Sequence, residues 1–204
     1  WSKGDQIAIA YTVSGEWMGA TNQSTGNLMG TKLYKSDALT EAAEIAQFNV
    51  NSNFNIVKEG EHVFYGVYPA PQSTDFTNAP FASLEIPAVQ TPTALSFDPS
   101  ADLMTAISVG KFTSLPAENE KISMRWTRLV AHANITLKDI NGAVVGEKVL
   151  SVKLIAQDGA NLVGKQKVNI LTNEVEKNND IANVLELSGS ALCVTEDSNV
   201  EFWA

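Results

Sequence analysis

The order of hydrophobic and polar residues along the chain predicts a protein built almost wholly of β-strands. In residues 5–13 the apolar side chains fall on every second position, which is typical of a strand with one buried face. Residues 148–156 alternate in the same way. Residues 62–68 are nearly all apolar or aromatic and predict a central strand buried on both faces. Shorter strands are expected at residues 31–35, 48–57, 84–87, 94–97, 168–170, 184–187, 191–195 and 200–203.

Residues 121–139 carry two competing periodicities. Read as a helix, one face would hold the apolar side chains Trp126, Leu129, Val130, Ala133 and Leu137. Read as strand, the apolar positions alternate but change phase near Thr127 and Arg128, which predicts a bulge or a break between two strands. The β-branched, alternating end of the stretch favours the strand interpretation.

The strand interpretation makes further predictions around this stretch. Asn141-Gly142 is a hairpin turn signal, so residues 134–139 are expected to pair with residues 148–156. Trp126 and Leu129 are expected to be buried on either side of the phase change. Arg125 and Arg128 are expected to face solvent, and His132 is expected on a strand face.

Two other regions have a different character. Ser36–Gln47 is rich in Ala, Leu and Glu after a capping residue and is the best candidate for a helix. Six of the seven prolines lie between Pro69 and Pro99, which excludes long strands there and predicts an ordered surface excursion or a functional loop.

The totals limit the classes of function. The chain has 204 residues, enough for one large domain, and we expect a β-sandwich domain in 1–165 with its remaining strands, or the start of a second β domain, in 166–204. The net charge of −9 disfavours binding to nucleic acid or to anionic lipid. No apolar run is long enough to span a bilayer, and because the chain begins with Trp1, we expect any export or lipid-anchor signal to lie upstream.

Few residues suggest chemistry. Cys193 is the only cysteine, so no intrachain disulfide can form, and it is expected to be a small buried hydrophobe. His62 and His132 are the only histidines and sit in no catalytic or metal-binding motif; His62 is expected to be structural or at the surface. Asp98 and Asp102 fit no EF-hand spacing and are expected to be solvated.

The remaining candidates are carboxylate pairs and aromatic side chains. The pairs Glu41/Glu44 and Glu59/Glu61 are expected to be solvated surface charge rather than acid–base pairs. Five aromatic residues are expected to pack in the core, with a sugar-binding platform as the alternative: Trp17, Tyr65, Tyr68, Trp126 and Trp203. We therefore predict no catalytic, cofactor-binding or metal-binding residue, no cofactor and no enzyme activity; a hydrolase with an unrecognised site is the remaining enzyme hypothesis.

Three motifs carry a resemblance to a known family. Trp1 followed by Gly-Asp-Gln-Ile at residues 4–7 resembles the first-strand signature of the fimbrillin family of Bacteroidales. Residues 62–69, His-Val-Phe-Tyr-Gly-Val-Tyr-Pro, resemble the family's aromatic strand, with Gly66 as a departure. Residues 102–106 and 124–137 resemble its closing strands. The match covers residues 1–156 in order and spacing, and the tail after about 165 matches poorly.

The resemblance implies an all-β protein with minor helix, a transthyretin-like Greek-key β-sandwich. It implies export as a lipoprotein to the outer membrane and the cell surface, and a role as a pilus subunit, anchor or tip protein. Its partners would be other fimbrial subunits, joined when a strand of one completes a groove in another. Host or bacterial surface glycans or proteins are further expected partners, nucleic acid is not, and a membrane is contacted only through a lipid anchor upstream of Trp1. A glycan-binding surface module or tip adhesin is the alternative function.

Overall fold

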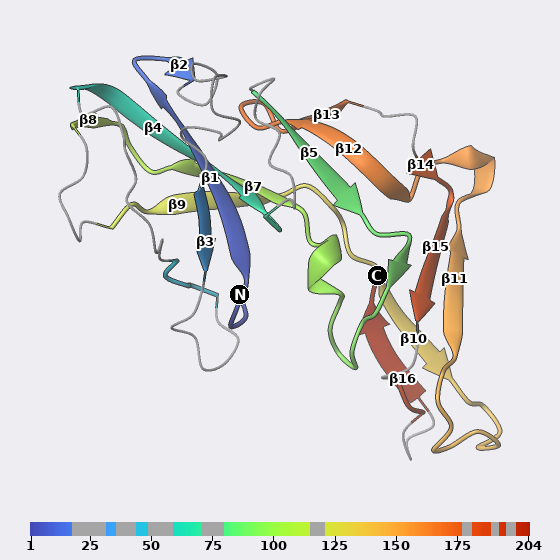
Figure 1. Ribbon diagram of the computed structural model, residues 1–204. Coiled ribbons are helices and arrows are strands. Elements are labelled where there is room, and N and C mark those ends of the chain that lie inside the picture. The colour runs from blue at the N-terminus through green and yellow to red at the C-terminus, as the bar shows by residue number, and fades with distance from the viewer. Residues whose placement is uncertain are drawn as a thin grey trace. The chain divides into compact units, whose positions relative to one another are not determined.

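The protein is nearly all β in the residues that the computed structural model describes, which are 1–17, 32–35, 44–48, 59–70, 80–114, 121–176, 181–188, 192–194 and 199–204 (Figure 1). The all-β prediction is confirmed, and the arrangement is sandwich-like. Most of the predicted helix and of the strand at 48–57 lies outside these residues. The described end of that helix, residues 44–47, is bend and coil rather than helix.

The described chain forms two compact units, each made of alternating segments. Unit 1 contains Trp1–Leu84, Leu103–Leu129 and Lys167–Glu176, and unit 2 contains Glu85–Asp102, Val130–Gln166 and Lys177–Ala204. The predicted division between residues 165 and 166 stays a prediction.

Unit 1 is built on one antiparallel sheet with the strand order β2-β1-β4-β7-β9, in which β3 also pairs with β1 and β8 with β4. Its strands are β1 Gln6–Val13, β2 Glu16–Trp17, β3 Lys32–Lys35, β4 Glu59–Tyr68, β7 Met104–Ser108, β8 Phe112–Ser114 and β9 Met124–Arg128. The prediction of a central strand at 62–68 is confirmed, since β4 lies between β1 and β7. The first strand was expected to bury one face, but residues 7–13 of β1 are all buried. Its second face carries only small side chains, Ala8, Ala10 and Thr12, which neighbours can cover completely.

One face of this sheet carries an aromatic and aliphatic core. Its buried members are Ile7, Ile9, Tyr11, Val13, Phe64 and Tyr68, and partly buried Trp1, Phe48, Phe112, Met124 and Trp126 pack against them. The apolar side chains at every second position of β1 therefore lie on the same face of the sheet, as their alternation in the sequence predicts.

Unit 2 contains two small sheets with a core between them. In one sheet β10 (Asn134–Lys138) pairs with β16 (Asn199–Trp203), and in the other β15 (Val184–Ser188) lies between β11 (Ser151–Ile155) and β6 (Val89–Gln90). Inward side chains of β15 and β16, among them Leu185, Leu187, Val200 and Phe202, form the buried core. Partly buried residues of β10 and β11 pack against it.

The predicted hairpin between residues 134–139 and 148–156 is wrong. β10 pairs with β16 and β11 pairs with β15, each in antiparallel register (Figure 1). The Asn141-Gly142 turn does occur, but the chain leaving it bridges from Lys148 to Cys193 instead of returning along β10. β10 and β11 each still bury one face, so the alternation of apolar residues was interpreted correctly. Their pairing partners, however, lie far away in the sequence.

A further sheet has the order β13-β12-β14, with β5 pairing to β12. Its strands are β5 Phe81–Ile86, β12 Val163–Asn169, β13 Glu174–Glu176 and β14 Ile181–Ala182. β5 starts earlier than expected in the proline-rich region, and the strand expected at 94–97 is absent, since those residues form turn and coil. Two 3-10 turns, η1 Pro99–Ala101 and η2 Gln157–Gly159, are the helical elements of the described residues.

The strand interpretation of residues 121–139 is confirmed. β9 ends at Arg128 and β10 begins at Asn134, so the phase change marks a break between two strands. Arg125 and Arg128 are exposed as predicted, but Trp126 and Leu129 are only partly buried. His132 lies in the break and not on a strand face.

Candidate functional site

The outer edge of β10 has no strand partner in the described part of unit 2. Ala133 and Ala204 exchange both backbone hydrogen bonds, with N···O distances of 2.7 and 3.0 Å. Because backbone groups alternate along an antiparallel strand, Ile135 and Leu137 also bond toward β16, and the N–H and C=O groups of Thr136 and Lys138 point the other way. The far edge of β16 is already used by Leu95 and Ser96. Within the described residues of unit 2, the open edge of this sheet is therefore that of β10.

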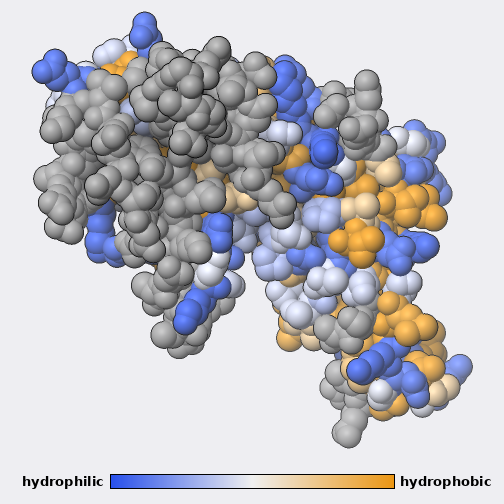
Figure 2. All heavy atoms as spheres, viewed as in Figure 1, coloured by the Kyte–Doolittle hydropathy of each residue, from blue (hydrophilic) through white to orange (hydrophobic). Residues whose placement is uncertain are grey.

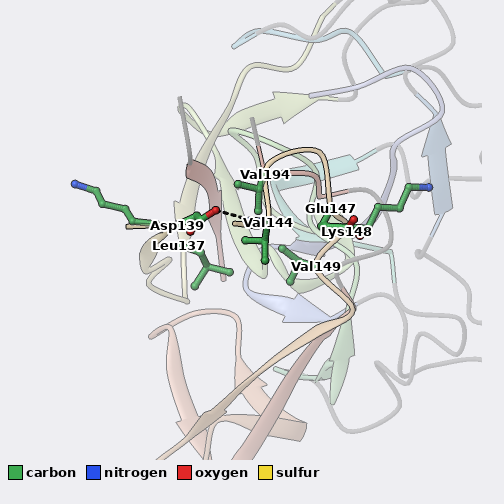
Figure 3. Close-up of a pocket in the computed structure, with 8 residues that line it drawn as sticks. Leu137, Asp139, Val144, Glu147, Lys148, Val149 and Val194 are labelled. Atoms are coloured by element: carbon green, nitrogen blue, oxygen red, sulfur yellow. Dashed lines mark hydrogen bonds between the residues drawn. The ribbon is translucent and has the colours of Figure 1, made fainter. Parts of the chain in front are cut away.

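An apolar pocket lies beside this edge, on the inner side of β10. It has a volume of about 290 Å³ (Figure 3). Leu137 supplies its β10 wall, and aliphatic side chains from the β10–β11 connection and from the segment before β16 supply the rest. The lining residues are Leu137, Lys138, Asp139, Val144, Glu147, Lys148, Val149 and Val194.

The connection from Asp139 to Leu150 is held at both ends. The Asp139 carboxylate accepts the backbone N–H of Asn141 at 3.1 Å and that of Val144 at 2.6 Å, the second of which Figure 3 marks. Farther on, residues 146–149 bond to residues 192–194, with N···O distances of 2.9 to 3.1 Å. This anchoring keeps Val144 and Val149 in the pocket wall.

Several aliphatic side chains on the same connection are exposed. Ile140 is 91% exposed and Leu150 is 87% exposed, while Val144 and Val145 are about half exposed. Figure 2 shows hydrophobic surface at this end of unit 2, mixed with charged residues. An open strand edge with apolar side chains on its inner side can accept an extended segment, whose alternate side chains would enter the pocket. Burying one aliphatic side chain there would contribute about 1.5–3 kcal/mol.

A second candidate is a buried His–carboxylate pair in unit 2. His132 Nε2 lies 3.2 Å from Asp102 Oδ1, and the two side chains are 10% and 5% exposed. The imidazole also stacks on Phe97, with ring centroids 4.3 Å apart. The pair fixes the β9–β10 break against the segment that leaves η1.

Asp98 is also buried, so the prediction that Asp98 and Asp102 are solvated is wrong. Its two oxygens accept hydrogen bonds from the backbone N–H and the hydroxyl of Thr91 and from those of Ser100, at 2.7 to 3.2 Å. Burial acts to raise the pKa of Asp98, but these bonds outweigh it and hold the pKa below its ordinary value. Asp98 therefore closes the turn around η1, with both of its carboxylate oxygens used by hydrogen bonds.

The prediction that Cys193 is buried is wrong. Leu192 and Val194 face the core, so the alternation of an extended segment turns Cys193 outward, where its thiol donates to the carbonyl of Gly146 at 3.3 Å. His62 is fully buried within β4, in keeping with a structural role. Among the described residues no group of three or more His, Cys, Asp or Glu side chains could hold a metal ion.

The described members of the two carboxylate pairs lie at the surface. Glu61 makes an exposed ion pair with Lys111 at 2.8 Å, and Glu59 is exposed. Glu44 is exposed, and Glu41 lies outside the described residues.

Four of the five candidate aromatic residues pack against other aromatic rings. Trp17 lies against buried Tyr65 with centroids 4.8 Å apart, and Trp1 contacts both Tyr68 and Trp126 at 5.1 Å. Trp203 lies on β16 of unit 2, partly buried. The core interpretation is thus the better one for Tyr65 and Tyr68, which are buried.

The sequence analysis did not predict the open edge of β10, because the alternation of apolar residues does not reveal which edge of a strand lacks a neighbour.

Comparison with known proteins identifies the fold. No family model matches the sequence, and no curated protein matches it. The structure is similar to that of a candidate cell adhesion protein from Bacteroides uniformis ATCC 8492, with a TM-score of 0.58 and 17% identity over 100% of this chain and 69% of that one. It is also similar to a candidate cell adhesion protein from Bacteroides ovatus ATCC 8483, with a TM-score of 0.56 and 13% identity over 100% of this chain and 68% of that one. At these identities the likeness establishes a shared fold.

No helix among the described residues is long and apolar enough to cross a membrane.

Proposed function

We propose that this chain is a cell-surface adhesion protein of the fimbrillin type. Two observations support the proposal: the fold is shared with two Bacteroides proteins assigned to adhesion, and the motifs at residues 1–9, 62–69 and 124–137 resemble those of fimbrillins. The chain would act outside the cell, on a fimbrium or at the outer membrane, held there by a lipid anchor.

The finer proposal is that the protein is a pilus subunit or accessory component that assembles by strand addition. The single observation that carries it is the open edge of β10 beside the apolar pocket at Leu137. An extended segment of another fimbrial subunit would pair with Thr136 and Lys138, and one of its aliphatic side chains would replace solvent in the pocket. Lys138 at the edge fits a strand that must avoid indiscriminate pairing before assembly.

We further propose that the protein has no catalytic role. The His132–Asp102 pair is the arrangement that most resembles an acid–base unit, and its near-complete burial supports a structural role. The glycan-binding alternative would need exposed aromatic rings, and Tyr65 and Tyr68 do not supply them.

Assembly of the full-length, matured protein tests the proposal. Light scattering and electron microscopy should show polymers whose amount rises with protein concentration. Thr136→Pro removes an outward N–H and adds a ring at the edge, so it should weaken association by about tenfold or more. Thr136→Ala keeps the N–H and is the matched control, which should assemble like the parent protein.

Two results would contradict the proposal. A matured protein that stays monomeric at every concentration would overturn assembly by strand addition. Equal assembly of Thr136→Pro and Thr136→Ala, both folded by circular dichroism, would overturn the assignment to β10.

A further inference from the structure

We propose that Asn141 is a site of spontaneous covalent modification, deamidation to aspartate and isoaspartate, and that the product loosens the wall of the β10 pocket. The inference does not depend on strand addition, because its readouts are the amide of Asn141 and the protection of the Val144 N–H. It starts from the one Asn-Gly sequence in the chain, at residues 141–142.

The local structure around Asn141 permits deamidation. Asn141 and Gly142 are both exposed and lie in a turn. Gly142 has no side chain to block approach to its nitrogen, and its φ of +66° is a conformation that glycine adopts readily. Asn134, by contrast, is followed by Ile135 in a strand, and its side-chain amide donates to Glu201 at 2.6 Å.

The chemistry needs only water. The deprotonated backbone nitrogen of Gly142 attacks Cγ of Asn141, the new C–N bond closes a succinimide, and ammonia leaves. Water then opens the ring at either carbonyl. Opening at one carbonyl gives aspartate, and opening at the other gives isoaspartate, in which the main chain runs through the former side chain. Both products place a carboxylate where a neutral amide stood.

The consequence follows from the bonds of Asp139. Its carboxylate accepts from the N–H groups of Asn141 and Val144, so residues 139–144 form a closed loop that contains the reacting linkage. Isoaspartate lengthens the main chain inside this loop, and both products add a negative charge two residues from Asp139. The hydrogen bond from Val144 to Asp139 should weaken, and Val144 lines the pocket.

Incubation of the purified full-length protein at mildly alkaline pH and body temperature tests the inference. Peptide mapping by mass spectrometry and labelling by an isoaspartyl methyltransferase should find conversion at Asn141 while Asn134 in the same sample keeps its amide. Hydrogen exchange at the Val144 N–H should become several-fold faster in the converted protein. Asn141→Gln should neither convert nor lose this protection with time.

Asn141→Asp separates the two causes, since it adds the charge without lengthening the main chain. We expect it to speed Val144 exchange less than the converted mixture does. An Asn141 amide that survives while a synthetic peptide of residues 137–149 is fully converted would overturn the modification site. Conversion with unchanged Val144 exchange would overturn its effect on the pocket wall.

Discussion

Trp126 packs so closely over Gly66 that a Cβ atom on Gly66 would lie 2.9 Å from Trp126 Cη2. The contact runs across the sheet in register, since Gly66 pairs with Ala106 on β7 and Ala106 pairs with Trp126 on β9. The same Cβ atom would lie 3.2 Å from Ala106 Cβ and 3.2 Å from Met124 Cε, so it would crowd three side chains at once. A glycine at position 66 therefore leaves the space that the indole of Trp126 occupies.

Gly66→Ala should destabilise the protein by about 1–3 kcal/mol, because overpacking forces the rings or the strands apart. The free energy of unfolding, measured by urea denaturation, checks this. Trp126→Phe replaces the indole by a smaller ring and serves as the background in which Gly66→Ala is measured again. In that background Gly66→Ala should cost clearly less, and an unchanged cost would show that the indole does not impose the glycine.

Asp98 should make stability depend on acid pH. Its pKa is lowered from the ordinary 3.8 in the folded protein, so the unfolded chain takes up the proton first as the pH falls. The stabilisation is fully present above pH 3.8 and is lost as the pH drops through the folded-state pKa.

Asp98→Asn should therefore cost about 1–3 kcal/mol at neutral pH, since an amide cannot accept from all four donors, and should flatten the acid limb of the stability profile. Denaturation with urea across the acid range measures both effects. Asp158→Asn, at an exposed aspartate, controls for the change in net charge. The account of Asp98 fails if both variants show the same profile as the parent protein.

The Asp102–His132 bond should appear as a coupling energy. Asp102→Ala and His132→Ala each leave a buried polar group without this partner, so the double substitution should cost less than the sum of the single ones by about 0.5–3 kcal/mol. Additive costs would contradict a direct interaction. His132→Phe keeps an aromatic ring against Phe97 and removes the hydrogen bond, so it should remain destabilising.

Cys193 should react with a soluble disulfide reagent in the native protein, because its side chain is exposed at the bridge with Lys148. Absorbance of the released thiolate measures the reaction, and Cys193→Ser gives the blank. If Cys193 reacts only after denaturant is added, the thiol is buried, as the sequence predicted, and the exposed position is contradicted.

The sequence predicted most strand positions because alternation depends only on the chain's own order. The bounds of β4 and β16 differ by only a few residues from the strands predicted at 62–68 and 200–203. The pairing of strands was harder to predict, because period-two alternation tells which face is buried and not which strand is the neighbour. The hairpin expected across Asn141-Gly142 failed for that reason.

The burial of polar residues could not be predicted from the sequence either. Asp98 is stabilised inside by Thr91, seven residues away, and Asp102 by His132, thirty residues away. Only the fold brings these partners together, so carboxylates that look solvated in the sequence are buried in the structure. The candidate site at β10 has the same origin, since an edge is open or closed according to strands elsewhere in the chain.

Hydrogen exchange at the backbone N–H of Thr136 tests strand addition most directly. In the unassembled protein this N–H points to the open edge and should exchange rapidly, whereas the N–H of Ile135, bonded toward β16, should be protected. In polymers of the full-length matured protein, the account predicts that Thr136 becomes protected while Ile135 stays as it was. Polymers in which the Thr136 N–H exchanges as fast as in the monomer would contradict it.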